Sequence, residues 1–224
     1  MGHDIKLTAS DGFQLGAYRA DPAGPAKAAV VVIQEIFGVN SHIRAVCDRF
    51  AAKGYVAIAP AIFDRIEPNF QSGYSPEEVA VARKFVTAPD FDAFLRDTQA
   101  AVDAAAPAGP VGVIGYCLGG SVAFLAATRL RGLKAAIGYY GGAIARFADE
   151  VPKVPVQLHF GEKDTGIPLD SVETVRGKRP EIEIHVYADA QHGFGCDERA
   201  SYHKPSAELA ATRSLAFFAE HLRA

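Results

Sequence analysis

The sequence predicts an α/β fold in which a mostly parallel, twisted sheet is flanked by helices on both faces. Three observations support this prediction. Short apolar segments alternate with longer amphipathic ones, and parallel neighbouring strands need such crossover helices. Several short segments are apolar throughout, which is typical of strands covered on both faces. The chain has 224 residues, 49% of them hydrophobic, without an internal repeat or low-complexity linker, so we expect a single domain spanning residues 1–224.

In the first half of the chain, turn residues delimit the elements. The Ser-Asp-Gly turn at residues 10–12 separates two short strands and predicts a hairpin. The unbroken apolar run at residues 28–34 indicates a buried parallel strand, and Ser41 is expected to cap the helix that follows. Residues 61–76 lack a regular pattern, as functional loops of that length often do, and Pro76 suits the first turn of a helix.

In the second half, helix-ending and strand signals follow one another closely. The helix from residue 90 is expected to end before Pro107 and Gly109, and the next strand runs almost directly into a helix rich in Ala and Leu. The expected strands span residues 5–7, 13–18, 28–34, 55–59, 111–114, 135–139, 154–160 and 182–187. The expected helices span residues 41–53, 76–86, 90–105, 119–130 and 206–221.

Charge and cysteine pattern argue against several functional classes. A formal net charge of −3 disfavours a nucleic-acid partner, because phosphate contacts need a basic excess. The chain lacks a secretory signal pattern and any apolar run near the roughly 20 residues of a bilayer span. We therefore expect a cytoplasmic protein without a membrane partner. Cys47, Cys117 and Cys196 are irregularly spaced, without a CxxC pattern, so free thiols, no metal and no other cofactor are expected.

Reactive side chains follow four of the expected strands. They are Glu35, Cys117, Asp164 and His192. In open parallel sheets, chemistry gathers at the carboxyl ends of the strands, so these four side chains are expected to converge at one edge.

Residues 115–119, Gly-Tyr-Cys-Leu-Gly, have the spacing of a G-x-S-x-G nucleophile elbow with sulfur in place of oxygen. A strand that turns straight into a helix crowds its neighbours, and glycine at 115 and 119 removes the Cβ atoms that would clash. The start of the helix would direct free N–H groups at the sulfur of Cys117 and favour its thiolate. The alternative is an inert buried cysteine in a glycine-rich turn.

The order nucleophile, acid, histidine makes the catalytic interpretation stronger than the inert one. Cys117, Asp164 and His192 follow each other as in α/β-hydrolases and unlike the order in chymotrypsin or subtilisin. His192 can take the thiol proton and later activate water, while Asp164 orients the imidazole. Asp170 and Asp189 are competing candidates for the acid, but Asp170 is expected to begin a helix and Asp189 lies too near His192 in sequence.

Together, several motifs make the chain resemble the dienelactone hydrolase family. The similarity runs over residues 7–222, and the family consists of small, cofactor-free, monomeric α/β-hydrolases that open enol-lactones, such as dienelactone to maleylacetate. The motifs are Val-Ile-Gln-Glu-Ile-Phe-Gly at 32–38, Gly-Tyr-Cys-Leu-Gly-Gly at 115–120, Gly-Tyr-Tyr-Gly at 138–141, the turn at 161–164 and His-Gly-Phe at 192–194.

The resemblance implies further site residues. The glutamate matching Glu35 holds the resting thiol protonated and takes its proton when substrate binds, which protects the sulfur from oxidation. Taken by itself, Glu35 could equally be a solvent-facing cap. The backbone N–H groups of Ile36 and Leu118 are expected to form the oxyanion hole, and Tyr140 to line the substrate pocket or to pack in the core.

The chain departs from the family pattern where arginines bind the carboxylate of the diene acid. Cys196 stands where one arginine is expected, and Arg199 is close but offset. Arg83 is a shifted substitute for the second arginine, and Arg65 is another candidate anion contact. The alternative for each of these arginines is a solvated surface charge that takes no part in binding the substrate carboxylate.

We therefore expect a cysteine-dependent hydrolase of lactones and activated carboxylic esters that acts as a monomer on a small molecule. Thiolate leaves a tetrahedral adduct more easily than an amine does, so amides should be poor substrates. Two alternatives are a broader carboxylesterase or thioesterase on the same residues and a non-catalytic protein that binds a small ligand. A thiol redox protein ranks last because no CxxC partner is present.

Overall fold

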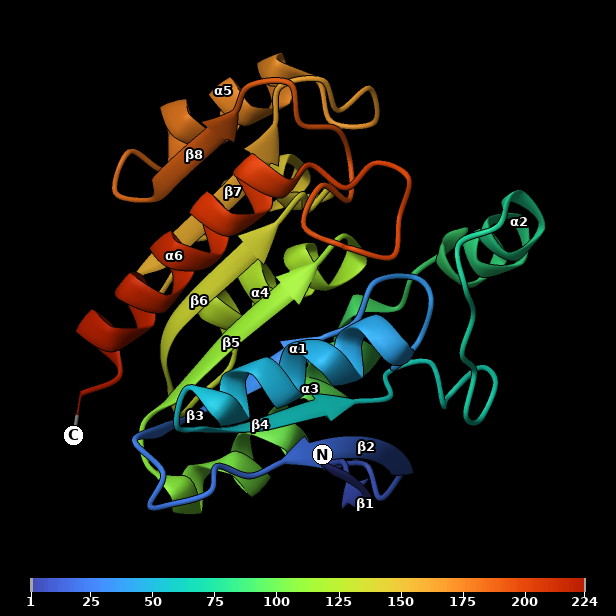
Figure 1. Ribbon diagram of the computed structural model, residues 1–224, viewed down its shortest axis with the longest axis vertical. Helices are drawn as coiled ribbons and strands as arrows, with labels where there is room; N and C mark the ends of the chain where they lie inside the picture. Colours follow the sequence, from blue (N-terminus) through green and yellow to red (C-terminus); the bar gives the residue numbers. More distant parts are fainter. Residues whose placement is uncertain (1, 224) are drawn as a thin grey trace.

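The computed structural model describes residues 2–223 and contains one eight-stranded sheet in the order β1-β2-β4-β3-β5-β6-β7-β8 (Figure 1). β2 pairs antiparallel with β1 and with β4, and all other neighbouring strands are parallel. The predicted mostly parallel α/β architecture is thus confirmed. The strands are β1 (His3–Thr8), β2 (Gln14–Ala20), β3 (Ala28–Ile33), β4 (Tyr55–Pro60), β5 (Val111–Tyr116), β6 (Leu133–Tyr139), β7 (Val156–Gly161) and β8 (Glu183–Tyr187).

Helices cover both faces of this sheet, as predicted. In Figure 1, α1 and α6 lie in front of the strands, α3 and α4 lie behind them, and α2 projects from one side. Within residues 2–223, no helix combines the length and apolar character that crossing a membrane would require. The helices are α1 (Ser41–Ala52), α2 (Pro76–Arg83), α3 (Phe91–Ala105), α4 (Leu118–Arg129), α5 (Leu169–Lys178) and α6 (Lys204–His221).

The apolar runs in the sequence became the central strands. Every residue of β3, β4, β5 and β7 is buried, whereas the edge strands β1 and β8 keep exposed positions. This difference follows from coverage: a central parallel strand has a helix layer on each face and must be apolar on both. The six strands β4, β3, β5, β6, β7 and β8 point the same way, so their carboxyl ends share one edge of the sheet.

Some expected boundaries were wrong for local reasons. The N-cap of α1 is Asn40 rather than Ser41, because the Asn40 side chain accepts a hydrogen bond from the Ile43 amide at 3.3 Å. Ser41 is the first helical residue and donates instead to Glu198 at 2.7 Å. The helix expected over 76–86 ends at Arg83, and a 3₁₀ turn continues it to residue 86.

A single residue, Cys117, separates β5 from α4. Its backbone adopts φ 56°, which is strained for any residue other than glycine. The bend is so tight that a Cβ atom on Gly115 would lie 1.8 Å from the Gly119 carbonyl oxygen. A Cβ atom on Gly119 would lie 2.4 Å from the Ile33 carbonyl oxygen of β3. The two glycines therefore allow strand, bend and helix to approach one another, as their spacing predicted.

We predict that Gly115→Ala destabilises the protein by about 3 kcal/mol or more, because backbone rather than a flexible side chain occupies the space its methyl group needs. Gly177→Ala is the matched control, since no atom lies within 4 Å of its Cβ position on α5. That variant should be neutral or more stable by about 0.5–1 kcal/mol, because alanine favours helix. Urea unfolding of both variants measures the difference, and equal stabilities would contradict the prediction.

Candidate active site

The four side chains predicted to converge all lie at the carboxyl edge of the sheet. Glu35 follows β3, Cys117 follows β5, Asp164 follows β7, and His192 follows β8. Because β3, β5, β6, β7 and β8 are consecutive in the sheet, the loops after them are neighbours. The structure places His192 in contact with both Cys117 and Asp164.

His192 bridges sulfur and carboxylate. Its Nε2 lies 3.1 Å from the Cys117 sulfur, and its Nδ1 lies 2.7 Å from Asp164 Oδ2. A carboxylate only accepts, so Nδ1 carries the hydrogen and donates it to Asp164. The other oxygen of Asp164 accepts from the amides of Gly166 and Ile167 at 2.9 and 3.1 Å. These bonds fix the carboxylate, and through it the tilt of the imidazole.

The environment of His192 favours its protonated form. Burial lowers the pKa of the ring, but negative charge at the Cys117 sulfur and the Asp164 carboxylate outweighs burial and raises the pKa to about 10. The imidazole can thus hold a proton that the sulfur gives up. The competing acid Asp189 is exposed and pairs with Lys163 at the surface, away from the imidazole.

The turn after β3 and the start of α4 are joined by a backbone bond. Gly119 donates its N–H to the Gln34 carbonyl oxygen at 3.1 Å, which holds the two segments together. Within residues 2–223, the N–H groups of Ile36 and Leu118 donate to no protein acceptor. Leu118 is the first residue of α4, where a free amide is expected. Among the described residues, neither predicted oxyanion-hole donor therefore has a protein acceptor.

Glu35 is buried beside the sulfur-bearing turn, with 1% of its side chain exposed. Arg199 Nη1 donates to its Oε1 at 2.9 Å, and the Tyr74 hydroxyl donates to its Oε2 at 3.3 Å. Among the described residues, the partner of the Cys117 sulfur is His192, not Glu35. The alternative of a solvent-facing cap is therefore wrong, because the carboxylate is enclosed and paired.

Arg199 is the cation that reaches this site, although its sequence position was offset from the expected one. Its guanidinium lies 5.6 Å from the ring centre of Phe37 and 5.8 Å from that of Tyr74. A Cβ atom on Gly193, where φ is 79°, would lie 2.6 Å from this guanidinium. Gly193 leaves room for this guanidinium, so a glycine directly after His192 is the feature of the sequence that could have indicated Arg199.

The two other arginines considered as anion contacts lie elsewhere. Arg65 donates to Asp97 at 2.7 Å and forms an ion pair with Asp11 at 2.9 Å, so its charge is already matched. Arg83 is exposed near the end of α2. Two acids therefore already hold Arg65, and Arg83 lies at the surface, so an anion contact by either residue stays a prediction.

Tyr140 lies against the imidazole. Its ring centre is 5.0 Å from that of His192, and its backbone has φ 38°. The side chain is fully buried, and within residues 2–223 its hydroxyl has no hydrogen-bond partner. Burial raises the pKa of this phenol well above its usual value, so it stays protonated. The residue therefore contacts both the core and the candidate site.

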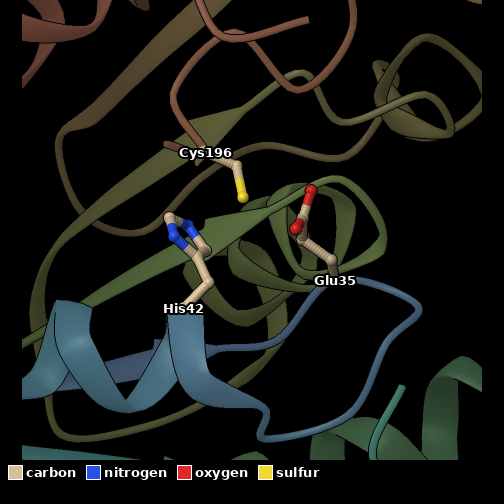
Figure 2. A group of neighbouring side chains, drawn as sticks. All are labelled: Glu35, His42 and Cys196. Carbon is tan, nitrogen blue, oxygen red and sulfur yellow. The ribbon is translucent and has the colours of Figure 1, made fainter. Parts of the chain in front are cut away.

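A second cluster of possible ligands adjoins this one. Glu35, His42 and Cys196 each offer one donor atom, and the three atoms lie within 4.8 Å of one another (Figure 2). A separate cavity of about 440 Å³ lies between α1 and α6, with Val46, Phe50 and Leu215 in its lining. None of Glu35, Cys117, Asp164 and His192 lines it, so we do not connect it with the chemistry.

The family model of the dienelactone hydrolase family matches residues 15–222. The chain belongs to this family. As a dienelactone hydrolase family member it is a hydrolase, and its fold is the α/β-hydrolase fold that the motifs implied.

Individual relatives agree with this membership. The chain is 37% identical to "Putative carboxymethylenebutenolidase" of Synechocystis, over 92% of this chain and 94% of the relative. It is 33% identical to the carboxymethylenebutenolidase of Pseudomonas putida, over 96% and 95% of the two chains. The crystal structure of a "Putative Dienelactone Hydrolase" from Klebsiella pneumoniae superposes with a TM-score of 0.85 at 33% identity, covering 98% of this chain and 99% of that one.

The raised pKa of His192 predicts a pH-dependent stability. The folded protein keeps the proton up to about pH 10, whereas the unfolded chain loses it near the ordinary value of 6.5. Stability from this group is therefore complete below pH 6.5 and declines as pH rises toward 10. We expect the difference in unfolding free energy between wild type and His192→Gln to shrink over that window in urea titrations. A pH-independent difference would contradict the assignment.

The buried pair of Arg199 and Glu35 predicts an asymmetric mutational response. Arg199→Ala leaves a buried carboxylate without its cation and should cost about 3 kcal/mol of stability. The double variant Glu35→Gln with Arg199→Met removes both charges and should be less destabilised than the single variant. Arg19→Ala, which breaks the more exposed pair with Asp21, should cost at most about 1 kcal/mol. Denaturant unfolding distinguishes these cases. A double variant with a lower free energy of unfolding than Arg199→Ala would argue against the pair.

Proposed function

We propose that this family member is a cysteine-dependent hydrolase of lactones and activated carboxylic esters, of the type that opens dienelactone to maleylacetate. The observation that carries the proposal is the 3.1 Å contact between His192 Nε2 and the Cys117 sulfur, with Asp164 on the other ring nitrogen. The name of the Pseudomonas putida relative, carboxymethylenebutenolidase, supports the substrate class.

The first half-reaction forms a thioester. His192 takes the proton of Cys117, and the thiolate attacks the carbonyl carbon of the substrate. The carbonyl oxygen becomes an oxyanion that the N–H groups of Ile36 and Leu118 stabilise, and two fixed donors can contribute several kcal/mol there. Collapse of the adduct breaks the bond to the ring oxygen, which leaves as an enolate or accepts the proton held by His192.

The second half-reaction restores the thiol. Once the proton that it took from Cys117 has passed to the enolate oxygen or to solvent, neutral His192 takes a proton from water, and the resulting hydroxide attacks the thioester carbonyl. The second adduct expels the sulfur of Cys117, which recovers a proton from His192, and the product acid departs. Asp164 stays ionised throughout and stabilises the imidazolium in both halves. The proton transfers involving the protein use Cys117, His192 and Asp164, and His192 is already within hydrogen-bond distance of the other two.

Glu35 is proposed to act on the thiol of Cys117, and Arg199 is proposed to bind a negatively charged group of the substrate. Glu35 assists activation of Cys117, because it lies beside the turn that carries the sulfur and is enclosed there, with 1% of its side chain exposed. Arg199 is the proposed contact for a substrate carboxylate, because it is the arginine that reaches the cluster. The monomeric state and cytoplasmic location expected from the sequence remain parts of the proposal.

Sulfur chemistry narrows the substrate class. In the tetrahedral adduct, a thiolate is a better leaving group than an amine but not than a stabilised enolate or phenolate. Lactones with an enol oxygen and aryl esters should therefore acylate Cys117 readily, while amides should return to reactants. A carboxylesterase of broader range would turn over neutral aryl esters as fast as anionic lactones.

We predict that Cys117→Ala lowers turnover of a chromogenic aryl ester or of dienelactone by about a thousandfold or more, because no nucleophile remains. Cys47→Ala is the matched control: this thiol is fully buried in α1, and its loss should leave turnover close to wild type. Asp164→Asn should also reduce kcat strongly while leaving KM nearly unchanged, because it disturbs the imidazole and not the pocket.

Three outcomes are decisive for this experiment. Turnover that disappears with Cys117 but persists in Cys47→Ala supports the enzyme. Wild-type protein that binds a lactone without opening it would indicate a ligand-binding protein instead. Turnover that survives in Cys117→Ala would refute the cysteine-dependent mechanism.

A further inference from the structure

Three buried side chains from separate segments meet next to the candidate active site. Glu35 lies in the turn after β3, His42 in the first turn of α1, and Cys196 in the long connection between β8 and α6. Figure 2 shows the carboxylate, imidazole and sulfur directed toward a common space. One donor atom from each lies within 4.8 Å of the other two, and all three residues are buried.

The imidazole of His42 presents an unused lone pair to this space. Its Nδ1 lies 3.2 Å from the Asp197 carboxylate, which can only accept, so Nδ1 carries the hydrogen. Nε2 is then the acceptor, and within residues 2–223 it has no hydrogen-bond partner although the side chain is fully buried. Burial lowers the pKa of this ring, so it is neutral at pH 7. A buried acceptor without a partner is costly unless something else uses it.

We propose that Glu35, His42 and Cys196 form a binding site for a thiophilic divalent cation such as Zn²⁺. A thiolate and a neutral imidazole favour Zn²⁺ over Mg²⁺ or Ca²⁺, which prefer oxygen ligands throughout. On binding, the S–H bond of Cys196 breaks, its proton passes to solvent and a sulfur–metal bond forms. A water molecule completes the four-coordinate shell.

The geometry needs only a small adjustment. Zinc bonds of about 2.0–2.3 Å place tetrahedral ligand atoms roughly 3.3–3.6 Å apart, so donors within 4.8 Å must close by about an ångström. The Asp197 contact to Nδ1 already has the form that orients metal-binding histidines, a carboxylate on the far ring nitrogen. Asp197 is half exposed, which leaves this side of the cluster near the surface.

Charge also favours a cation here once the thiol is deprotonated. The Glu35 carboxylate and the Cys196 thiolate together neutralise a divalent ion, and Asp197 adds a further negative charge behind the imidazole. The opposing charges are Arg199, which is bonded to Glu35 at 2.9 Å, and Arg49, whose Nη1 lies 3.6 Å from Asp197. Metal that takes the Glu35 carboxylate therefore competes with Arg199 for it. If the proposed hydrolase mechanism holds, the metal is an inhibitor that withdraws Glu35 from the reaction.

Cobalt(II) titration of the Cys117→Ala protein tests the site without the catalytic thiol. We expect one Co²⁺ per chain, a thiolate-to-metal charge-transfer band and the intense visible bands of tetrahedral cobalt, all displaced by Zn²⁺. Adding Cys196→Ala should abolish the charge-transfer band, whereas adding Cys47→Ala should leave it unchanged. Asp197→Asn, also in Cys117→Ala, should weaken cobalt binding by about tenfold or more.

Each alternative result overturns the site. Absence of a charge-transfer band in Cys117→Ala, whose fold is checked by circular dichroism, refutes it without any further variant. A band that persists after Cys196→Ala assigns the thiolate to another cysteine and refutes it as well. Binding is read spectroscopically in a protein that cannot turn over, so failure of the proposed hydrolysis and failure of the metal site are distinguishable.

Inhibition is measured separately on the enzyme with Cys117 intact. If metal-free wild type hydrolyses an ester, Zn²⁺ should reduce its rate, and Cys196→Ala, normalised to its own metal-free rate, should lose at least tenfold in zinc sensitivity. Equal sensitivity of both proteins would refute inhibition through this site.

Discussion

The site depends on the contact between the backbone of β5 and that of α4 at Cys117. Cβ-free glycines at 115 and 119 let the helix begin one residue after the strand ends, and this approach lifts the sulfur out of the sheet at φ 56°. The same bend leaves the Leu118 amide free and ties Gly119 to the turn after β3. A looser turn would separate the sulfur from the free amides and from the imidazole, so one constraint positions the sulfur and the amides.

The acid and the imidazole are held by a different principle. Each lies in a loop at the end of its own parallel strand, and hydrogen bonds from backbone amides stabilise that loop. Asp164 uses one oxygen for its own turn and the other for His192. Because these local bonds do not involve the sulfur, they orient the imidazole without a bound ligand, which is the preorganisation that the proposed acid–base mechanism requires.

The sequence was sufficient to predict the location of residues that are placed by the end of a single strand. Cys117, Asp164 and His192 each lie in the segment that follows a strand, so parallel topology predicts that they converge. Arg199 could not be predicted in the same way, because its position depends on the irregular path between β8 and α6 and on the space above Gly193. The ion pairs of Arg65 could not be predicted for a related reason: its partners Asp11 and Asp97 are distant in sequence, and no periodic pattern reveals such a contact.

Glu35 connects the two clusters, and its neighbours explain why one buried carboxylate can take part in both. A single ionised side chain with 1% exposure needs compensation, and Arg199 with the Tyr74 hydroxyl supplies it on both oxygens. Any cation that enters from the side of His42 must compete with that compensation, and so must a substrate carboxylate that draws Arg199 away. Both events would break the Glu35–Arg199 pair. The metal would take Glu35 from Arg199, and the substrate carboxylate would take Arg199 from Glu35. Under both proposals, the bonding partner of the Glu35 carboxylate would therefore determine whether Glu35 can assist Cys117. A substrate carboxylate and a bound metal would each change that partner.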